Sequence, residues 1–326
     1  MTGLLACRAD AVELGVQGAE FTLDGTPRFL LGISYYGALG APRQVLESDL
    51  AQMQRAGFNW IRVWATWGGF DNDVSALDVE GRARAPFLGT LKWLVEECDR
   101  RGMVVDVTLT RGDAASGPGR VGSAAAHRRA VETLARELAS LRNWYLDLAN
   151  ERNIRDARFV DFAELAELRQ LVRKIDERRL VTASQGGDIS RDELKRYVQE
   201  VGVDFVTPHR PRDADSPGQT AEQTRTYRKW MEEEGRLVPV HYQEPFRRGY
   251  NPRGWEPPAS GFLADLDGAI AGGAAGWCFH NGDQKDRPEG RPRRSFDLRD
   301  GALFEQLDAE EKALCEELAR RRASTP

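Results

Sequence analysis

Apolar and polar positions follow one repeating pattern from residue 29 onward. Short runs rich in Val, Ile, Leu, Phe and Trp alternate with longer segments in which apolar residues recur every three or four positions. The short runs are typical of buried parallel strands, and the longer period is typical of amphipathic helices. The pattern predicts strands at 29–36, 59–67, 103–110, 143–149, 179–185, 203–209, 237–244 and 274–281.

A helical segment follows each of these strands. Some of these segments end at glycine, as at Gly57 and Gly102, and glycine readily adopts the left-handed conformation that closes a helix. The predicted helices cover 42–57, 87–102, 124–141, 159–179, 190–201, 220–235, 261–273 and 303–322. Eight consecutive strand–helix units predict a closed (β/α)8 TIM barrel of the α/β class.

A β-hairpin is predicted before the barrel. Asp24–Gly25 separates two alternating runs, and Asp-Gly is a strong signal for a tight turn between antiparallel strands. We expect a single domain over residues 1–326, in which the hairpin of residues 1–28 caps a barrel formed by residues 29–322. A length of 326 residues is usual for one α/β barrel.

Composition narrows the classes of function. The chain has 46 basic and 51 acidic residues and a net charge of −5, so it lacks the basic footprint of a nucleic-acid or membrane-surface protein. No apolar run approaches the roughly 18 residues of a membrane span. The four cysteines are scattered, and no glycine-rich phosphate loop follows a strand. We therefore expect no cofactor and no metal site.

The segment from Leu4 to Cys7 has a faint likeness to a lipoprotein cleavage box. A complete signal has a longer apolar stretch before the box, so we treat the match as chance. The sequence as given suits the cytoplasm, and a periplasmic or secreted location applies if an export signal has been removed. Composition leaves the oligomeric state open.

Two glutamates end strands on opposite sides of the predicted barrel. Glu151 follows the fourth strand and Glu244 follows the seventh. Chemistry in such barrels takes place at the carboxyl ends of the strands, so the two carboxylates are expected to face each other. Retaining glycoside hydrolysis requires such a pair roughly 5–5.5 Å apart. Read alone, Asn150–Glu151 is also an ordinary helix start.

The motifs at these positions resemble the glycoside hydrolases of clan A, and most of all the cellulase-like family 5. The likeness begins with FTLDGTPRFLLGISYYG and GFNWIRVW and spans nearly the whole chain. It depends chiefly on LANE (148–151), PVHYQE (239–244) and GWCFHN (276–281). Each motif is weak alone, but their order along the strands is fairly specific.

The resemblance implies a retaining β-glycosidase that acts on a carbohydrate without a metal. It implies Glu151 as the acid/base and Glu244 as the nucleophile. Asn150 would bind the sugar 2-hydroxyl, Arg62 would pair with Glu244, and Trp277 would form an apolar floor beneath the sugar. A buried arginine needs a carboxylate partner in any case. Further substrate-binding candidates at the strand ends are His209, Tyr35, Trp64 and His280.

Three departures from the family pattern indicate a divergent branch. Residues 209–211 read His-Arg-Pro, so the strand-six tyrosine that contacts the nucleophile is absent. The third strand ends in Thr-Arg at 110–111 in place of the family's histidine, and Arg152 replaces the common proline. These departures put the substrate in doubt more than the mechanism. The candidates to replace the missing tyrosine are Tyr35, Tyr36 and Tyr242.

Two other functions remain open on the sequence. The missing tyrosine also fits a carbohydrate-binding barrel that has lost catalysis. A metal-dependent sugar isomerase would need several carboxylates and histidines around a divalent ion, and only His209 and His280 accompany the two glutamates. The longest loops, at 68–86, 111–123 and 245–260, carry charged residues and predict a polar cleft wall suited to a decorated glycan.

Overall fold

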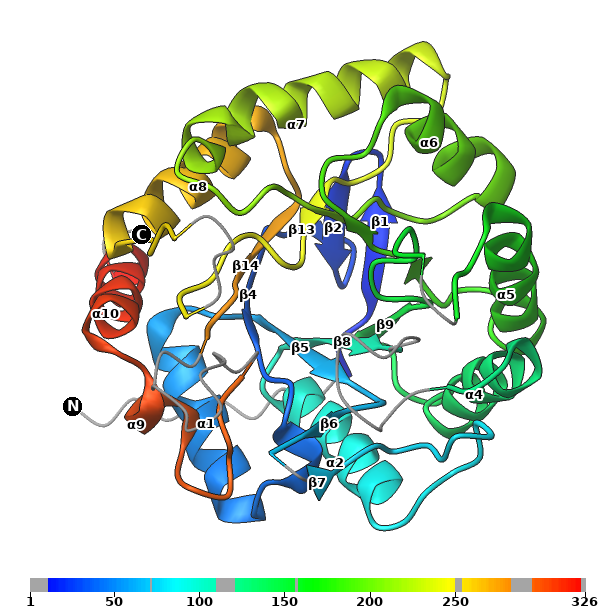
Figure 1. The fold of residues 1–326 in the computed structure, drawn as a ribbon, viewed down its shortest axis with the longest axis horizontal. Helices are drawn as coiled ribbons and strands as arrows, with labels where there is room; N and C mark the ends of the chain where they lie inside the picture. Colours follow the sequence, from blue (N-terminus) through cyan, green and yellow to red (C-terminus); the bar gives the residue numbers. More distant parts are fainter. Residues whose placement is uncertain are drawn as a thin grey trace.

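The computed structural model describes residues 11–70, 72–109, 121–155, 158–249, 254–282 and 295–323. A ring of strands lies at the centre, and helices surround it (Figure 1). Seven parallel strands are neighbours in the order β10-β9-β8-β5-β4-β14-β13. Their bounds are Leu30–Ser34 (β4), Trp60–Trp64 (β5), Val104–Thr108 (β8), Trp144–Asp147 (β9), Val181–Thr182 (β10), His241–Tyr242 (β13) and Gly276–Phe279 (β14).

The sixth strand position closes the ring. There β12 (Pro208–His209) pairs in parallel with β11 (Gln185–Gly186), which continues from β10. On its other side Val206 forms a parallel bridge with Val240, and the amide of His241 donates to the carbonyl of Val206 at 2.9 Å. The (β/α)8 barrel predicted from the sequence is confirmed.

Helices cover the outside of the ring, as the sequence periodicity predicts. The side chains of Ser123 and Asp161 cap α4 and α5, and Gly57 ends α1 with a φ of 95°. No helix in the described part of the chain is long and apolar enough to cross a membrane. The bounds are Ala38–Gly40 (η1), Arg43–Ala56 (α1), Phe87–Arg100 (α2), Ala124–Glu137 (α4), Phe162–Ile175 (α5), Arg191–Lys195 (α6), Arg196–Val201 (η2, a π-helix), Ser216–Glu233 (α7), Ala259–Gly272 (α8), Leu303–Gln306 (α9) and Ala309–Ala323 (α10).

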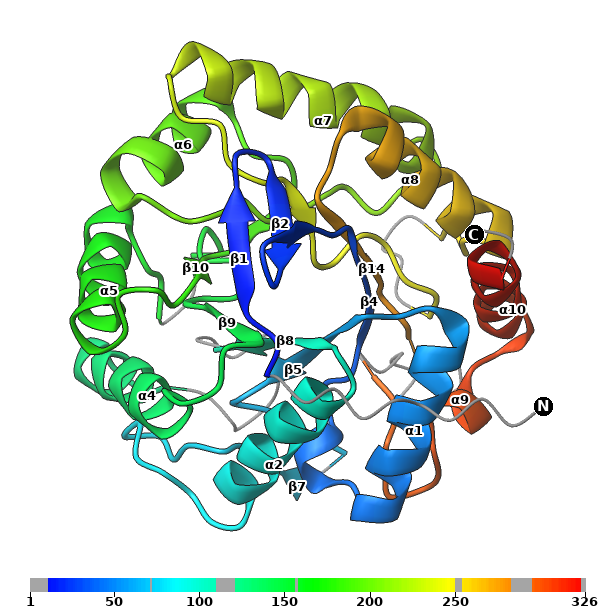
Figure 2. The same ribbon diagram turned by 180° about the vertical axis from the view of Figure 1, so that it is seen from behind.

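A three-stranded antiparallel sheet covers the amino-terminal end of the barrel (Figure 2). It consists of β1 (Leu14–Gln17), β2 (Glu20–Leu23) and β3 (Thr26–Pro27). Asp24 and Gly25 have φ values of 54° and 75°, so the tight turn lies where the Asp-Gly signal predicts it. The sequence pattern did not reveal β1. Two short strands, Gly68–Gly69 (β6) and Asn72–Asp73 (β7), form a hairpin in the loop after β5.

The cap and the barrel share an apolar core at this end. Phe21 of β2 packs against Phe205 with ring centroids 5.0 Å apart. Trp60 donates its indole N–H to Nε2 of His241 at 2.6 Å, and the hydroxyl of Tyr145 lies 3.0 Å from the same nitrogen. Burial lowers the pKa of His241 to about 3, so this ring is neutral. The amino-terminal part of the barrel is thus a packed core, and a catalytic site is expected at the carboxyl end of the strands.

Candidate active site

Two glutamates meet at the carboxyl end of the barrel. Glu151 follows β9 and Glu244 follows β13, and one carboxylate oxygen of each lies within 4.8 Å of the other. The Glu244 side chain is fully buried, whereas 12% of the Glu151 side chain is exposed. The structure therefore brings together the two carboxylates that the strand positions predict to face each other. Their catalytic roles stay predictions.

Both oxygens of Glu244 contact cationic or hydroxyl groups. Oε1 accepts hydrogen bonds from the guanidinium of Arg62 and from the hydroxyl of Tyr36, the latter at 2.9 Å. Oε2 lies 3.0 Å from Nη2 of Arg212 and 3.5 Å from Nδ1 of His209. Charge-assisted hydrogen bonds of this kind favour the ionised carboxylate, which is the form that can attack an electrophile.

Arg62 is the buried centre of this network. Its Nη1 contacts Glu244, its Nε donates to Asp106 at 3.0 Å, and its Nη2 donates to Asp147 at 3.1 Å. Nη2 also donates to Oδ1 of Asn150 at 3.0 Å, which fixes that amide beside the glutamates. Burial would lower the pKa of Arg62, but the surrounding carboxylates raise it well above its ordinary value. One permanent cation thus faces three carboxylates.

The raised pKa of Asp106 reduces the negative charge around Arg62. Burial raises its pKa to about 7 against the opposing charge of Arg62, and the nearby Asp147 adds to the increase. Gln243 donates to the same Asp106 oxygen as Arg62, at 2.8 Å. Near neutral pH the Asp106 carboxyl therefore carries a proton part of the time, which reduces repulsion among the carboxylates around Arg62.

Glu151 occupies a strained backbone position. Its φ of 45° lies in the left-handed region, which costs a non-glycine residue on the order of 1 kcal/mol. Its amide donates to Oγ of Ser184 at 2.9 Å, and its carboxylate lies 3.2 Å from Nδ1 of His209 and 3.6 Å from Nη2 of Arg212. Burial would raise the pKa of Glu151, but His209 and Arg212 outweigh that effect and hold the pKa well below its usual range.

Among the three candidate tyrosines, Tyr36 contacts the nucleophile candidate. The hydroxyl of Tyr35 donates to Asp49 of α1 at 2.7 Å, and the hydroxyl of Tyr242 lies 2.6 Å from Oγ1 of Thr224 on α7. The prediction that Tyr35 binds substrate is therefore wrong. Alternate residues of a strand point to opposite faces, so Tyr35 faces the helices while Tyr36 faces the barrel axis.

The structure also contradicts the predicted position of Trp277. The sequence places it beneath the sugar, but its indole Nε1 donates to Asp265 of α8 at 2.6 Å, and the side chain is fully buried between β14 and the helices. Cys278, the next residue, packs in the inner core with Trp60 and Tyr145. The alternation along β14 therefore turns Trp277 outward, and it cannot form the floor of the site.

Aromatic side chains line the inner wall beside Tyr36. The ring of Trp64 lies 4.8 Å from it, that of Trp67 5.4 Å and that of His280 5.8 Å, measured between centroids. All four side chains are buried. The structure therefore brings Trp64 and His280 to the side of the site where the sequence predicts them. Their contact with substrate stays a prediction.

Several site residues were missed in the sequence. Asp106 and Asp147 did carry a signal, because each is a carboxylate within an otherwise apolar strand, and Asp106 stands opposite Arg62 in the register of β5 and β8. Arg212 carried none, since it lies in the loop after β12. Residues 110–111, where the family's histidine is replaced, lie outside the described residues.

Arg152 links residues that support the site. Its guanidinium stacks over the ring of Phe162 at 3.8 Å and donates to the hydroxyl of Tyr197 at 3.1 Å. Its backbone amide donates to the carbonyl of Ser184 at 2.9 Å. Proline has no amide hydrogen, so the family's usual residue would lose this link between two neighbouring strand ends.

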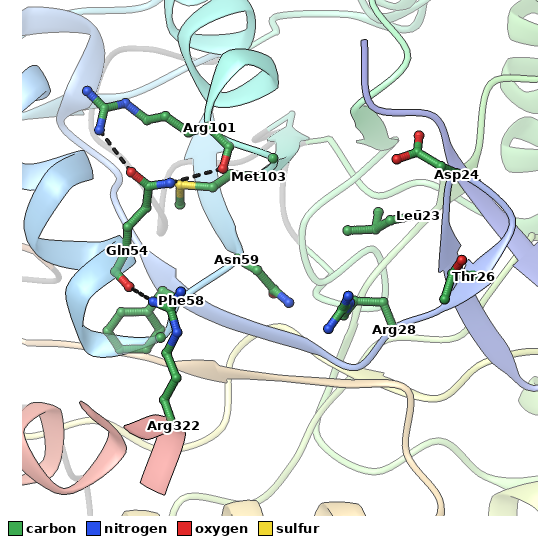
Figure 3. A pocket seen from close by; sticks show the side chains of 12 residues that line it. Leu23, Asp24, Thr26, Arg28, Gln54, Phe58, Asn59, Arg101, Met103 and Arg322 are labelled. Carbon is green, nitrogen blue, oxygen red and sulfur yellow. Dashed lines mark hydrogen bonds between the residues drawn. The ribbon is translucent and has the colours of Figure 1, made fainter. Parts of the chain in front are cut away.

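A cavity of about 510 Å³ opens at the opposite, amino-terminal end of the barrel (Figure 3). Asp24 and Thr26 of the cap line one side, and Gln54, Arg101 and Arg322 line the other. Gln54 and Arg101 bond each other twice, each time at 3.0 Å. Residues at this end of a barrel generally serve stability, and the paired carboxylates lie at the other end.

Comparisons with known proteins place the fold. No family model and no curated protein matches the chain. A family 5 mannosidase from Rhizomucor miehei matches it with a TM-score of 0.65 and 14% identity, over 95% of this chain and 99% of that one. The chain has the barrel fold of glycoside hydrolase family 5.

Two further structures give the same result. An endo-1,4-β-D-mannanase from Thermotoga petrophila matches with a TM-score of 0.59 and 14% identity, over 90% of this chain and 99% of that one. A longer protein from Bacteroides vulgatus matches with a TM-score of 0.70 and 18% identity, and this chain spans 61% of its length. At these identities the likeness establishes the fold, and the reaction has to be argued from the site.

Proposed function

We propose that the protein is a retaining β-glycoside hydrolase that cleaves an oligo- or polysaccharide by double displacement. The separation of Glu151 and Glu244 carries this proposal. Their nearest oxygens lie within 4.8 Å of each other. Retaining enzymes hold their carboxyl groups roughly 5–5.5 Å apart, whereas inverting enzymes leave roughly 6.5–9.5 Å for a water molecule. The family 5 barrel fold supports the same class of reaction.

The contacts of the two glutamates suit two different roles. Arg62 and Tyr36 engage Oε1 of Glu244, and Oε2 lies beside Arg212. Because Arg212 also approaches Glu151, Oε2 is the oxygen on the side of the second carboxylate and the one that would attack the anomeric carbon. Glu151, which is less buried, would protonate the departing oxygen and then remove a proton from the water that hydrolyses the glycosyl-enzyme. Because Arg62 engages Oδ1 of Asn150, the Nδ2 amide would meet the sugar 2-hydroxyl.

The solved neighbours suggest where to look for the sugar. One is named a mannosidase and another an endo-1,4-β-D-mannanase. We therefore propose β-mannosides as the first series to assay, with β-glucosides and β-galactosides beside them. The two neighbours differ in endo and terminal action, so both polymers and aryl glycosides belong in the assay.

The test removes each carboxylate in turn. Glu244→Ala and Glu151→Ala should each lower kcat by several orders of magnitude on a natural glycan. Azide should restore activity to Glu151→Ala on an aryl glycoside with a good leaving group, because that substrate needs no proton donor and the small anion fits the vacated space. Glu222→Ala, an exposed position on α7, is the matched control. Full activity in either site variant would contradict the proposal.

The metal-dependent isomerase is the alternative that one observation favours. Glu151, His209 and Glu244 offer three ligand atoms within 4.8 Å of one another. The guanidinium groups of Arg62 and Arg212 contact these same carboxylates, however, and two cations there oppose binding of a divalent ion. Dialysis against EDTA should leave glycosidase activity unchanged, and loss of activity restored by a divalent metal would favour the isomerase.

The carbohydrate-binding barrel without catalysis loses its main support. It was motivated by the tyrosine missing from residues 209–211, and Tyr36 supplies a hydroxyl to Glu244 from another strand. Turnover of an activated aryl β-glycoside by the wild-type protein, with Glu244→Ala as the blank, would exclude this alternative.

A further inference from the structure

Arg212 lies between the two carboxylates. Its Nη2 is 3.0 Å from Oε2 of Glu244 and 3.6 Å from Oε1 of Glu151. His209 approaches the same two oxygens, at 3.5 Å and 3.2 Å, but its side chain is fully buried, whereas 13% of the Arg212 side chain is exposed. Arg212 is therefore the cation on the accessible side of the pair.

A reacting sugar has to enter the space that Arg212 occupies. The anomeric carbon must approach Oε2 of Glu244, and the glycosidic oxygen must approach Glu151. A guanidinium in largely buried surroundings is costly to separate from its carboxylates unless another anion takes their place. A neutral sugar offers no such anion.

The loop that carries Arg212 is anchored, so its side chain can move without the backbone. Ser216, at the start of α7, donates its amide to Asp213 at 3.1 Å and its hydroxyl to the carbonyl of Pro211. These two bonds bracket position 212. The long arginine side chain can therefore swing between partners while its α-carbon stays in place.

We propose that Arg212 is a specificity residue that selects a uronic acid at the cleaved bond, by transferring its guanidinium from Glu244 and Glu151 to the carboxylate of the substrate. This inference rests on the proposed function, since it assigns a substrate class to the same site. A planar carboxylate matches the two parallel N–H groups of a guanidinium and can accept both.

The same transfer would prepare the proton donor. Arg212 is one of the groups that hold the pKa of Glu151 low, after the stronger effect of His209. When the guanidinium pairs with the substrate, the Glu151 carboxyl gains affinity for the proton that it must donate. A neutral glycoside would leave Arg212 on both glutamates and lack this effect.

The experiment compares glycosides that differ only at C6. Aryl β-mannosides, β-glucosides and β-galactosides are each paired with the corresponding uronide, and kcat/KM is measured for wild type and Arg212→Gln. Wild type should prefer one uronide over its neutral partner by at least about tenfold. Arg212→Gln should remove this preference, so that the ratio of the two kcat/KM values, uronide over neutral partner, falls at least about tenfold whatever the change in absolute activity. Arg136→Gln, on the exposed surface of α4, removes a charge elsewhere and should leave the ratio unchanged.

Two results would overturn the inference. A clear preference of the wild-type protein for the neutral member of every pair would refute Arg212 as a selector of uronides. An equal loss on both members in Arg212→Gln would give Arg212 a general role in site geometry instead.

A different result is expected if the proposed glycosidase function itself is wrong. Wild type would then hydrolyse none of the six glycosides, and selectivity would be measured by calorimetric titration with the same compounds. Tighter binding of a uronide by wild type, lost in Arg212→Gln, would still support the role of Arg212. Equal binding of the acidic and neutral compounds would refute it.

Discussion

The hydroxyl of Tyr36 donates a 2.9 Å hydrogen bond to Oε1 of Glu244, although 208 positions separate the two residues in the chain. Tyr36 follows β4, which pairs with β14, and β14 in turn pairs with β13 before Glu244. A tyrosine from the start of the barrel thus donates to the glutamate after β13. Residues 209–211 lack the tyrosine that the resemblance to family 5 leads one to expect there, and Tyr36 reaches the same glutamate from β4.

Tyr36→Phe tests the importance of this contact. The variant leaves Arg62 as the remaining partner of Oε1 among the contacts described for that oxygen, so Glu244 should be less well oriented. We expect kcat to fall about 10- to 100-fold with little change in KM, measured on an aryl glycoside. Tyr35→Phe is the neighbouring control, because it removes a hydroxyl that bonds Asp49 outside the barrel. Its cost should be about 1 kcal/mol in the free energy of unfolding, with kcat preserved. Equal kcat in both variants would contradict the prediction.

Arg62→Lys tests whether the planar guanidinium is required. Three different nitrogens of Arg62 reach Glu244, Asp106 and Asp147, and a single ammonium on a shorter head group cannot match that geometry. We expect kcat/KM to fall at least about 1,000-fold. Unfolding in urea should show a loss of roughly 3 kcal/mol, because one lysine ammonium cannot pair with all three buried carboxylates at once. Wild-type stability in this variant would refute the central role of Arg62.

His209→Ala should shift the pH dependence of activity. The hydrogen bond and charge of His209 are the main influences that lower the pKa of Glu151 against the effect of burial. In the proposed role of general acid, Glu151 donates a proton only when it is protonated, so activity should fall as pH rises through its pKa. Without His209 that pKa rises, and the alkaline limb of kcat/KM should move to higher pH. A limb that stays in place or moves to lower pH would assign it to another group.

Asp265→Asn should change the pH dependence of stability. Burial raises the pKa of Asp265 to about 6, against the hydrogen bonds of Thr220 and Trp277. Between about pH 4 and pH 6 the folded state therefore binds a proton that the unfolded state releases. The contribution of Asp265 to the free energy of unfolding is thus greatest below about pH 4 and is lost as pH rises through about 6.

Asparagine should remove that decline. Its carbonyl can accept from Trp277, and its amide can donate to the hydroxyl oxygen of Thr220, whose hydrogen can then donate to the carbonyl of Ser216 instead of to residue 265. Relative to Asp265→Asn, wild type should lose on the order of 2 kcal/mol between pH 4 and pH 7, measured by urea unfolding at each pH. Parallel stability curves for the two proteins would show that Asp265 is ionised throughout this range.

The sequence by itself determined the barrel and the location of its chemistry. Eight apolar runs, each followed by an amphipathic helix, favour a closed parallel ring over an open doubly wound sheet. The position of Glu151 after the fourth run and Glu244 after the seventh then places two carboxylates across one end of it. Arg62 could also be inferred, since a charge within an apolar strand requires a buried partner.

Tertiary structure alone decided which neighbours face the axis. In strands that are buried on both faces, apolar residues occupy both faces. The sequence therefore does not indicate which of two successive residues points to the barrel axis and which points to the helices. Tyr35 and Tyr36 are identical side chains, and only the register of β4 against β5 turns Tyr36 to Glu244 and Tyr35 to α1. For the same reason the sequence predicts Trp277 at the inner face of the barrel, whereas its side chain points outward to Asp265. Arg212 lies beyond any periodic pattern, because the path of a loop depends on the elements that it joins.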